Sequence, residues 1–379
     1  MKLKEIVLIV LLCIIFFLPI YFRPDTMPVN GMDSYFFLNY IYGITDGIPQ
    51  TPIFSQFVMD IIPPNLFVIK TIMLLVVILS VLLFAWASEN IKPGYAVLLA
   101  MLLLGNIFFN KLLIRFEDDL FALPFIALSF YLITLYLYKK RDLMWLYLAL
   151  GSWVVSCLFW KFAVYLIILY ALWTMSYIFF IPAMLLVLFS FDQLFSGAIG
   201  NFSVAENMQF IGILILFLPF IILLFSKKTN PYYEEIIVPL WFSLVMILIN
   251  VKSALLFFPF MAIYFFVTFK KQPKSIRIIN ILVILLIFCI ATYQNLCAVP
   301  NEQYYELIEI AQQQKGIHNK EINVSWGFGY FWIWNSNEKY PVFGWIQPTI
   351  ENGIIIRAKS EQTKCPVVFE NRVGTVEVC

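Results

Sequence analysis

Long apolar runs separated by short polar segments dominate the chain before residue 298. A bilayer core requires about 20 apolar residues per helix, and this length predicts about eleven membrane-spanning helices. The predicted spans are residues 5–22, 66–86, 95–114, 120–138, 143–159, 162–178, 179–191, 209–226, 235–250, 253–270 and 277–295. We interpret the first as a retained helix, because Arg23-Pro24-Asp25 follows it in place of a small-residue cleavage site.

Polar residues become frequent after residue 297, where the pattern changes character. An amphipathic helix is predicted at 302–314, and short strands are predicted at 322–324, 353–358 and 367–370. An aromatic run from Trp326 to Trp334 lies between the first two of these strands. The pattern therefore predicts a transmembrane domain at 1–297 and a small α/β or α+β domain at 298–379.

Composition supports this division and limits the classes of function. The chain of 379 residues is 62% apolar and 13% charged, with a mean hydropathy of +0.88, as expected for a multi-pass protein of the lipid bilayer. No nucleic-acid-binding motif or basic patch is present, so we expect no nucleic-acid partner. A single histidine, His318, argues against a histidine-based zinc site.

The six cysteines show no CxxC spacing. Three of them, Cys13, Cys157 and Cys289, lie in apolar spans and are interpreted as small hydrophobic residues. If the polar C-terminal region is extracytoplasmic, a disulfide such as Cys365 with Cys379 is consistent with its surroundings, although the sequence leaves the pairing open.

Basic residues in short loops predict the orientation, because such loops stay on the cytoplasmic side. The clusters are Lys2 with Lys4, Lys139-Lys140-Arg141, Lys227-Lys228, and Lys270 to Arg277. All of them fall on one side of the predicted spans. We therefore expect a cell-membrane protein with a cytoplasmic N-terminus, and with the loops at 23–65 and 192–208 and the C-terminal domain outside.

Three consecutive acids, Glu117 to Asp119, lie between two apolar runs on the predicted outer face. Neighbouring carboxylates raise each other's pKa, and partial burial adds to the cost of ionising them. A divalent cation such as Mg²⁺ or Mn²⁺ would offset this repulsion and bridge carboxylates to phosphate. The alternative is that the acids cap a helix beginning at Leu120.

Further polar residues lie next to predicted spans on the same face. Asp33 precedes the aromatic segment Tyr35 to Tyr42, which predicts an interfacial helix, and Glu206 precedes a later span. Each of these acids has the alternative role of a helix cap. Because they share one face with Glu117 and Asp119, we expect all four to form one metal-centred site. Lys252, at the outer end of a predicted hairpin, is either a lone cation of that site or a lysine that reaches the lipid headgroups.

The order of these motifs resembles the catalytic subunit of oligosaccharyltransferase, a membrane glycosyltransferase of the C superfamily (GT-C). The matching residues are Gly31-Met32-Asp33-Ser34-Tyr35, Glu117-x-Asp119, Ser203-Val204-Ala205-Glu206 and Trp326-Gly327-Phe328-Gly329-Tyr330. The resemblance implies Asp33, Glu117 and Asp119 as metal ligands, catalytic roles for Asp33 and Glu206, and Lys252 as the contact to the donor phosphate. It also implies a GT-C fold for the transmembrane part.

The acceptor motif departs from that family. Its Trp-Trp-Asp-Tyr-Gly sequence appears here in degenerate form as Ser325-Trp326-Gly327-Phe328-Gly329, without the acid. The resemblance therefore implies acceptor binding at residues 326–330, with either a protein asparagine or another glycan or lipid as the acceptor.

The resemblance implies metal-assisted transfer of a sugar or oligosaccharide from a polyprenyl or dolichyl (di)phosphate donor on the extracytoplasmic face. A related enzyme that uses a polyprenyl monophosphate sugar and a lipid or glycan acceptor is the first alternative. A transporter is the second, although transporters usually place ionisable or broken positions in the middle of their spans. Here the acids gather at one face, which favours the enzyme.

Overall fold

The computed structural model describes residues 1–23, 25–28, 33–44, 53–187, 225, 227, 230–249, 251–269, 272–324, 326–336, 353–359 and 365–379. These residues form two compact units. The helical unit comprises Met1–Phe17, Ile72–Leu113 and Asp118–Tyr293, and the sheet unit comprises Leu18–Thr71, Ile114–Glu117 and Gln294–Cys379.

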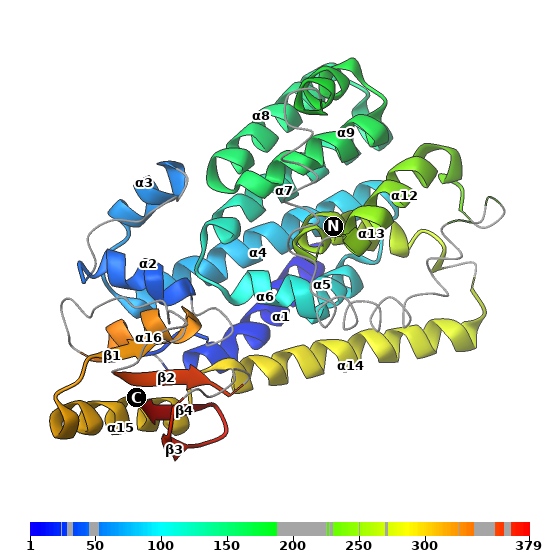
Figure 1. The fold of residues 1–379 in the computed structure, drawn as a ribbon. Helices are drawn as coiled ribbons and strands as arrows, with labels where there is room; N and C mark the ends of the chain where they lie inside the picture. Colours follow the sequence, from blue (N-terminus) through cyan, green and yellow to red (C-terminus); the bar gives the residue numbers. More distant parts are fainter. Residues whose placement is uncertain are drawn as a thin grey trace. The chain divides into compact units, whose positions relative to one another are not determined.

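Helices account for most of the described chain (Figure 1). Among the described residues, four helices have residues in both units: α1 (Leu3–Tyr21), α4 (Leu66–Ile91), α6 (Ile107–Ile114) and α14 (Lys274–Ala298). The other elements that the described residues form before α14, apart from α2 and α3, are α5 (Ala96–Gly105), α7 (Asp118–Leu135), the π-helical turn η2 (Tyr136–Lys140), α8 (Leu143–Phe159), the 3-10 helix η3 (Lys161–Tyr165), α9 (Leu166–Thr174), helix Tyr177–Val187, α12 (Tyr233–Ile249) and α13 (Val251–Phe265).

Four segments of the described chain are long and apolar enough to cross a membrane, judged by length and composition: Leu3–Tyr21, Leu66–Ile91, Asp119–Lys140 and Lys274–His318. The protein is thus mainly helical, with features of a membrane protein, but eleven helices of spanning length are not found in the described part. Two of the predicted spans are interrupted. Asn106 has an extended backbone (ψ 120°) that separates α5 from α6, and Met175 has a left-handed backbone (φ 48°) that ends α9. The predicted span 209–226 lies outside the described residues, apart from 225.

Aromatic and small side chains hold the helices of the helical unit together. Helix α7 packs along α8, where the rings of Phe125 and Phe159 stack at 5.6 Å and the Ser152 hydroxyl donates to the Phe125 carbonyl at 2.8 Å (Figure 1). Helix α5 approaches α14 closely at Gly105, where an added Cβ would lie 3.0 Å from the backbone nitrogen of Phe288. Small residues permit such close packing between apolar helices.

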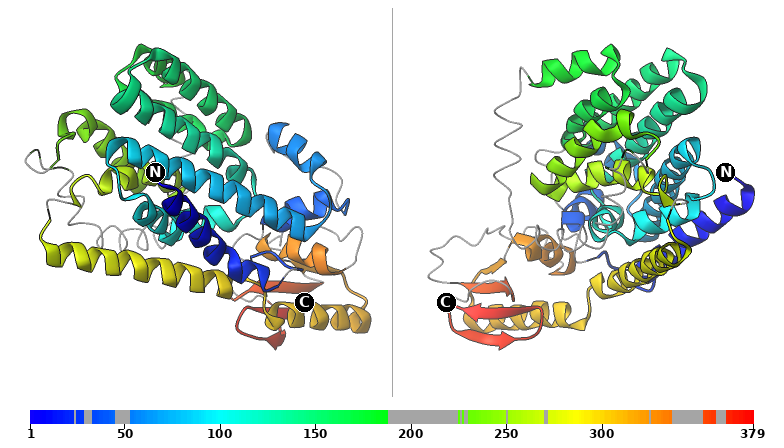
Figure 2. Two further views of the ribbon diagram at one scale, coloured as in Figure 1. Left: turned by 180° about the vertical axis from the view of Figure 1, so that it is seen from behind. Right: turned by 90° about the vertical axis from the view of Figure 1, so that its right-hand side faces the viewer.

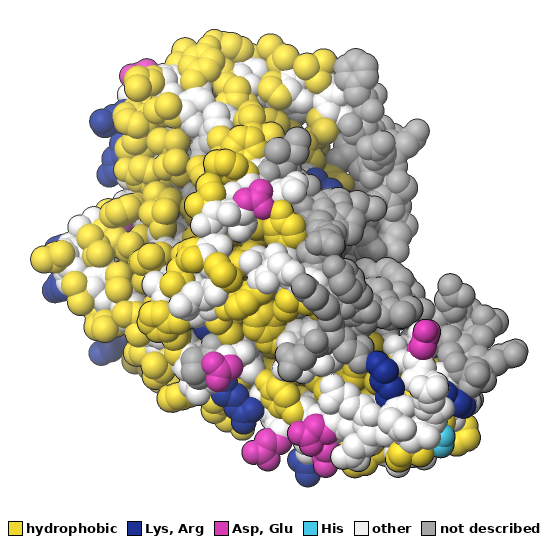
Figure 3. Space-filling view, turned by 90° about the vertical axis from the view of Figure 1, so that its left-hand side faces the viewer, with side chains coloured by type: hydrophobic (Ala, Val, Ile, Leu, Met, Phe, Trp, Pro, Cys, Tyr) yellow, Lys and Arg dark blue, Asp and Glu magenta, His cyan; other side chains and the backbone are white. Residues whose placement is uncertain are grey.

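Large apolar side chains remain exposed on many helices. On α14 they include Ile279, Leu282 and Leu286, and Figure 3 shows apolar side chains over much of one face of the protein. Water-soluble proteins rarely expose apolar surface on this scale, whereas a bilayer covers it. The exposure therefore agrees with the membrane character of the apolar helices.

The sheet unit contains helices α2 (Asp33–Ile41), α3 (Ile53–Ile61), α15 (Glu302–His318) and α16 (Trp326–Ser336), and strands β1 (Ile322–Val324), β2 (Ile354–Ala358), β3 (Val367–Glu370) and β4 (Gly374–Val378). The strand order is β1-β2-β4-β3, with β1 parallel to β2 and the other pairs antiparallel. Helix α15 lies along β2 and β4 in both views of Figure 2. Strand β1, helix α16 and strand β2 follow one another in the chain, and the small sheet that the sequence predicted after residue 297 is present.

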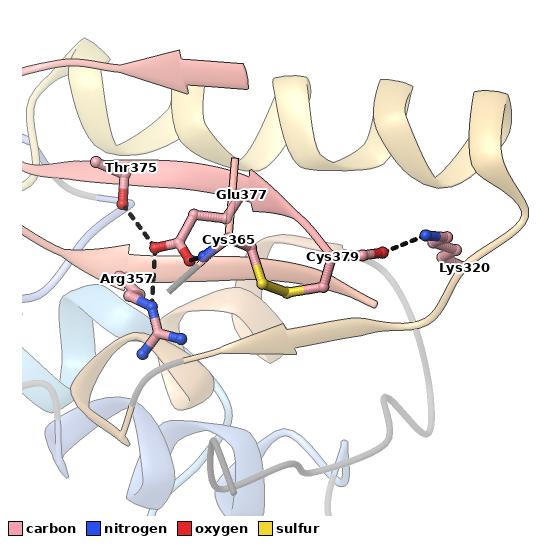
Figure 4. Close-up of a disulfide and its surroundings, with 6 residues drawn as sticks. All are labelled: Lys320, Arg357, Cys365, Thr375, Glu377 and Cys379. Carbon is pink, nitrogen blue, oxygen red and sulfur yellow. Dashed lines mark hydrogen bonds and ion pairs between the residues drawn. A yellow bond between two sulfur atoms is a disulfide. The ribbon is translucent and has the colours of Figure 1, made fainter. Parts of the chain in front are cut away.

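Polar and covalent links tie the sheet together (Figure 4). Arg357 Nε on β2 lies 2.8 Å from Glu377 Oε1 on β4, and both side chains are buried. The same carboxylate accepts from the backbone N–H of Cys365 at 3.1 Å. Cys365 and Cys379 form a disulfide, which was one of the pairings that the sequence left open. Cys365 is therefore held both by its sulfur and by its backbone.

Candidate functional site

The N-terminal end of α2 contacts the segment that carries the first acid of the triplet. The backbone N–H of Phe116 donates to the Ser34 hydroxyl at 3.0 Å, and this contact is buried. The rings of Phe37 and Phe116 meet edge to face at 6.4 Å. Ser34 directly follows Asp33, and Phe116 directly precedes Glu117. The structure thus brings together two chain positions that adjoin predicted metal ligands, 82 residues apart in sequence.

Glu117 lies in the sheet unit, in the short connection between α6 and α7. Its carboxylate is 3.8 Å from Arg115 Nε, and its side chain is 12% exposed. A guanidinium at this distance partly neutralises the carboxylate, while the low exposure limits screening by water. Carboxylate oxygens suit a hard divalent cation, so the donor chemistry of Glu117 fits the predicted metal.

Asp118 and Asp119 lie in the first turn of α7, because the helix begins two residues earlier than predicted. Asp119 is buried and belongs to the helical unit. Acids in a first helical turn are favoured by the helix dipole, so the structure also accommodates the capping alternative for these two residues.

The other predicted site residues are placed only in part. Asp33 is the first residue of α2 and Lys252 is the second residue of α13, but their side chains lie outside the described part, as does all of Glu206. Among the described residues, no group of three or more Cys, His, Asp or Glu side chains is arranged to hold a metal. The complete ligand set therefore stays a prediction.

The aromatic run predicted to bind the acceptor forms helix α16, which packs against α2. The Asn39 amide donates to the Tyr330 carbonyl at 3.0 Å, and the rings of Phe36 and Tyr330 meet at 4.8 Å. Phe328 is buried and stacks on Tyr304 of α15 at 5.5 Å. The Trp326 side chain is outside the described part, and Gly329 is buried. Phe328 and Gly329 are therefore packed within the sheet unit.

Helix α2 corresponds to the helix that the sequence predicted at a membrane interface, and that location stays a prediction. It forms at the expected residues, but Tyr35, Phe37 and Leu38 are buried. The rings of Tyr35 and Phe331 of α16 meet edge to face at 5.1 Å. An aromatic pattern in sequence does not distinguish a protein partner from a lipid surface, and here α16 provides a protein partner.

Tyr35 also fixes the segment that precedes α2. Its hydroxyl accepts from the Met27 N–H at 3.0 Å and donates to the Met27 carbonyl at 2.9 Å. Burial raises the pKa of Tyr35, so its hydroxyl stays neutral. Sequence reasoning did not identify Ser34, Asn39 or Tyr35 as contact residues. Ser34 and Tyr35 belong to the motif around Asp33, but spacing alone does not reveal a distant partner.

These observations define a mainly helical protein with membrane-type apolar helices and a small mixed sheet. In its sheet unit, α2 contacts both Phe116 and helix α16. Comparison with family models, curated proteins and solved structures finds no match to this chain. The functional assignment consequently depends on the residues themselves.

Proposed function

We propose that this protein is a membrane glycosyltransferase of the GT-C type, which transfers a sugar or oligosaccharide from a polyprenyl (di)phosphate donor on the extracytoplasmic face. The observation that carries the proposal is the hydrogen bond between Phe116 and Ser34. It supports a shared location for the loops that contain Asp33 and Glu117. Independent helix caps would not require these loops to meet.

The residues have distinct parts in the proposed reaction. Asp33, Glu117 and Asp119 would hold Mn²⁺ or Mg²⁺, which when bound neutralises negative charge on the donor phosphate. Arg115, beside Glu117, limits repulsion among the acids before the donor arrives. Lys252 would contact the phosphate as a point charge, and Glu206 would orient the acceptor nucleophile.

The acceptor side of the site favours a second candidate within the same class. The aromatic run lacks the family's acid, and Phe328 is packed against Tyr304. A buried phenyl ring offers no hydrogen-bond partner to a hydroxyl-bearing peptide. A polyprenyl monophosphate sugar donor with a lipid or glycan acceptor would use the same acids without that contact.

The C-terminal disulfide supports the proposed orientation. Disulfides persist in oxidising compartments and are rare in the cytosol of most cells. The Cys365–Cys379 bond belongs to the sheet unit, as do α2 and the segment with Glu117. An extracytoplasmic sheet unit would therefore put Asp33 and Glu117 outside the cell.

The test uses the full-length protein in lipid vesicles with Mn²⁺ and with diphosphate-linked or monophosphate-linked polyprenyl sugar donors. Asparagine-containing peptides and glycolipids would be supplied separately as acceptors. Asp33→Asn and Glu117→Gln should each lower transfer at least about 100-fold, since each removes a proposed metal ligand. The matched control is Glu309→Gln, which changes an exposed acid of α15 and should transfer at the wild-type rate.

Electron paramagnetic resonance of bound Mn²⁺ provides a readout independent of turnover. We expect the wild type and Glu309→Gln to bind the ion equally well and the two site variants to bind it weakly. Full transfer activity and unchanged Mn²⁺ binding in both site variants would remove the proposed site. Transfer to peptide or to glycolipid would select between the two acceptor classes.

A further inference from the structure

Helix α3 presents three different faces around its axis. Ser55, Met59 and Ile62 form a buried stripe that includes the residue after the helix. Gln56 and Asp60 are exposed polar residues one turn apart. Phe54, Phe57 and Ile61 form a third stripe that is apolar and yet 44%, 61% and 65% exposed, respectively.

The order of these faces around the helix axis shows that the exposed apolar stripe is separate from the buried one. At about 100° per residue, the exposed apolar stripe occupies an arc between the polar stripe and the buried stripe. A helix that contacts only protein and water needs two faces, one buried and one polar. A third, apolar face indicates a further apolar surface, and a helix lying in the plane of a membrane interface has this arrangement.

The ends of α1 and α4 show where the membrane boundary lies in the sheet unit. The Lys70 ammonium group on α4 donates to the carbonyls of Ile20 at 3.0 Å and Arg23 at 2.8 Å, at the end of α1. The rings of Tyr21 and Phe67 also meet edge to face at 6.1 Å. Because both helices are long and apolar enough to cross a membrane, their adjoining ends mark one level of the bilayer.

Helix α3 is held close to this level. Only residues 62–65 separate Ile61 from the first residue of α4, which limits the separation of these helix ends to about 17 Å. Phe67, in the first turn of α4, is 60% exposed, so exposed aromatic surface continues on the lipid-facing helix after the linker. Asn65 caps α4 by accepting from the Phe67 N–H at 3.0 Å, which sets where the membrane helix starts.

We propose that α3 is an in-plane membrane anchor whose Phe54, Phe57 and Ile61 side chains insert into the lipid bilayer. Gln56 and Asp60 face the aqueous side. The Asp60 carboxylate accepts from the Tyr40 hydroxyl at 2.6 Å, so an anchored α3 also restrains α2. The anchor is independent of the proposed glycosyl transfer and would operate in any membrane protein with this loop.

The test places a single environment-sensitive fluorescent label on α3. Cys13, Cys157, Cys289 and Cys297 are first changed to Ala, while Cys365 and Cys379 stay in their disulfide and do not react. Phe57→Cys and Ile61→Cys report on the apolar stripe, and Gln56→Cys on the same helix is the matched control. The full-length protein is reconstituted into phosphatidylcholine vesicles that contain a lipid with a spin label near the glycerol end of its acyl chain.

Labels at positions 57 and 61 should lose most of their fluorescence to the spin-labelled lipid and resist quenching by aqueous iodide. The label at position 56 should show the reverse. Iodide quenching at 57 and 61 equal to that at 56 would overturn the proposal. Protection from iodide without quenching by lipid would overturn it as well, because the stripe would then be covered by protein, such as a second copy of the chain. Two positions are used so that a folding defect in one variant does not decide the outcome.

Discussion

The hydroxyl of Ser34 accepts a hydrogen bond from the backbone N–H of Phe116 at 3.0 Å in a buried environment. The contact joins the first turn of α2 to the connection between α6 and α7. Backbone N–H groups buried away from water require an acceptor, and a serine hydroxyl can provide one across a distance in sequence. Together with the ring contact of Phe37 and Phe116, the Ser34 hydroxyl therefore helps to position the loop carrying Asp33 against the segment carrying Glu117.

Substitution of Ser34 by Ala should destabilise the protein. The change removes the hydroxyl acceptor of the buried Phe116 N–H, and such a loss costs about 1–3 kcal/mol. Ser80→Ala is the matched control, since Ser80 is also buried but its hydroxyl donates to Val76 within its own helix. Thermal unfolding in vesicles should show a lower midpoint for Ser34→Ala than for Ser80→Ala. Equal midpoints would mean that the Ser34 contact contributes little.

The same contact should affect Mn²⁺ binding at the proposed site. Ser34→Ala leaves both proposed carboxylates in place, so any loss of Mn²⁺ affinity arises from their altered positions. Changes to groups that orient metal ligands typically lower affinity about 10–100-fold. A titration of Mn²⁺ measured below the unfolding temperature would separate this effect from global destabilisation. Unaltered Mn²⁺ affinity would argue that the contact has a structural role alone.

The secondary structure of the sheet unit was largely predictable, but its contacts were not. Strand β1 was placed at its observed residues, and β2 and β3 were also expected. Strand β4 was missed, although Thr375-Val376-Glu377-Val378 alternates polar and apolar residues. In this strand Glu377 is buried by pairing with Arg357, and that partner is invisible in a local pattern.

The span prediction failed for a related reason. Hydropathy measures the apolar content of a segment, and residues 95–114 are apolar enough to be predicted as one membrane span. Hydropathy does not detect the extended backbone of Asn106, which divides this segment into two helices. The candidate acids were identifiable because charge is conspicuous in an apolar chain. The contact of Ser34 with Phe116, next to Glu117, and the contact of Asn39 with Tyr330 depend on tertiary packing, which the sequence alone did not indicate.

Separate substitutions of Arg357 and Glu377 should be more harmful than their joint replacement. Removing one member of a buried ion pair leaves an uncompensated charge and typically costs about 3–5 kcal/mol, whereas two apolar residues of similar size are often neutral. We expect Arg357→Met and Glu377→Met each to lower the unfolding midpoint strongly and the double variant to regain much of the loss. A double-mutant cycle from denaturant unfolding measures the coupling. Additive losses would show that the two side chains act independently.

The Cys365–Cys379 disulfide should stabilise the sheet unit by constraining its unfolded chain. The cysteines are 14 residues apart, and a loop of this length corresponds to about 3 kcal/mol in the chain-entropy model. Cys365→Ser, Cys379→Ser and the double variant should therefore unfold at the same, lowered denaturant concentration. Cys297→Ser, which changes an exposed free cysteine, is the control and should match the wild type. A further loss in the double variant would point to a separate packing role for the two sulfurs.

Two glycines in the helical unit should respond in opposite ways to the same substitution. At Gly105 an added Cβ would lie 3.0 Å from both Ile287 Cγ2 and the Phe288 backbone nitrogen, so α5 and α14 would have to move apart. Overpacking of this kind costs about 1–3 kcal/mol. At Gly151, in the middle of α8, an added Cβ meets no atom within 4 Å among the described residues, so alanine should gain up to about 1 kcal/mol from its higher helix propensity. Gly105→Ala should thus lower the thermal midpoint and Gly151→Ala should hold or raise it, while equal responses would contradict the close packing of α5 on α14.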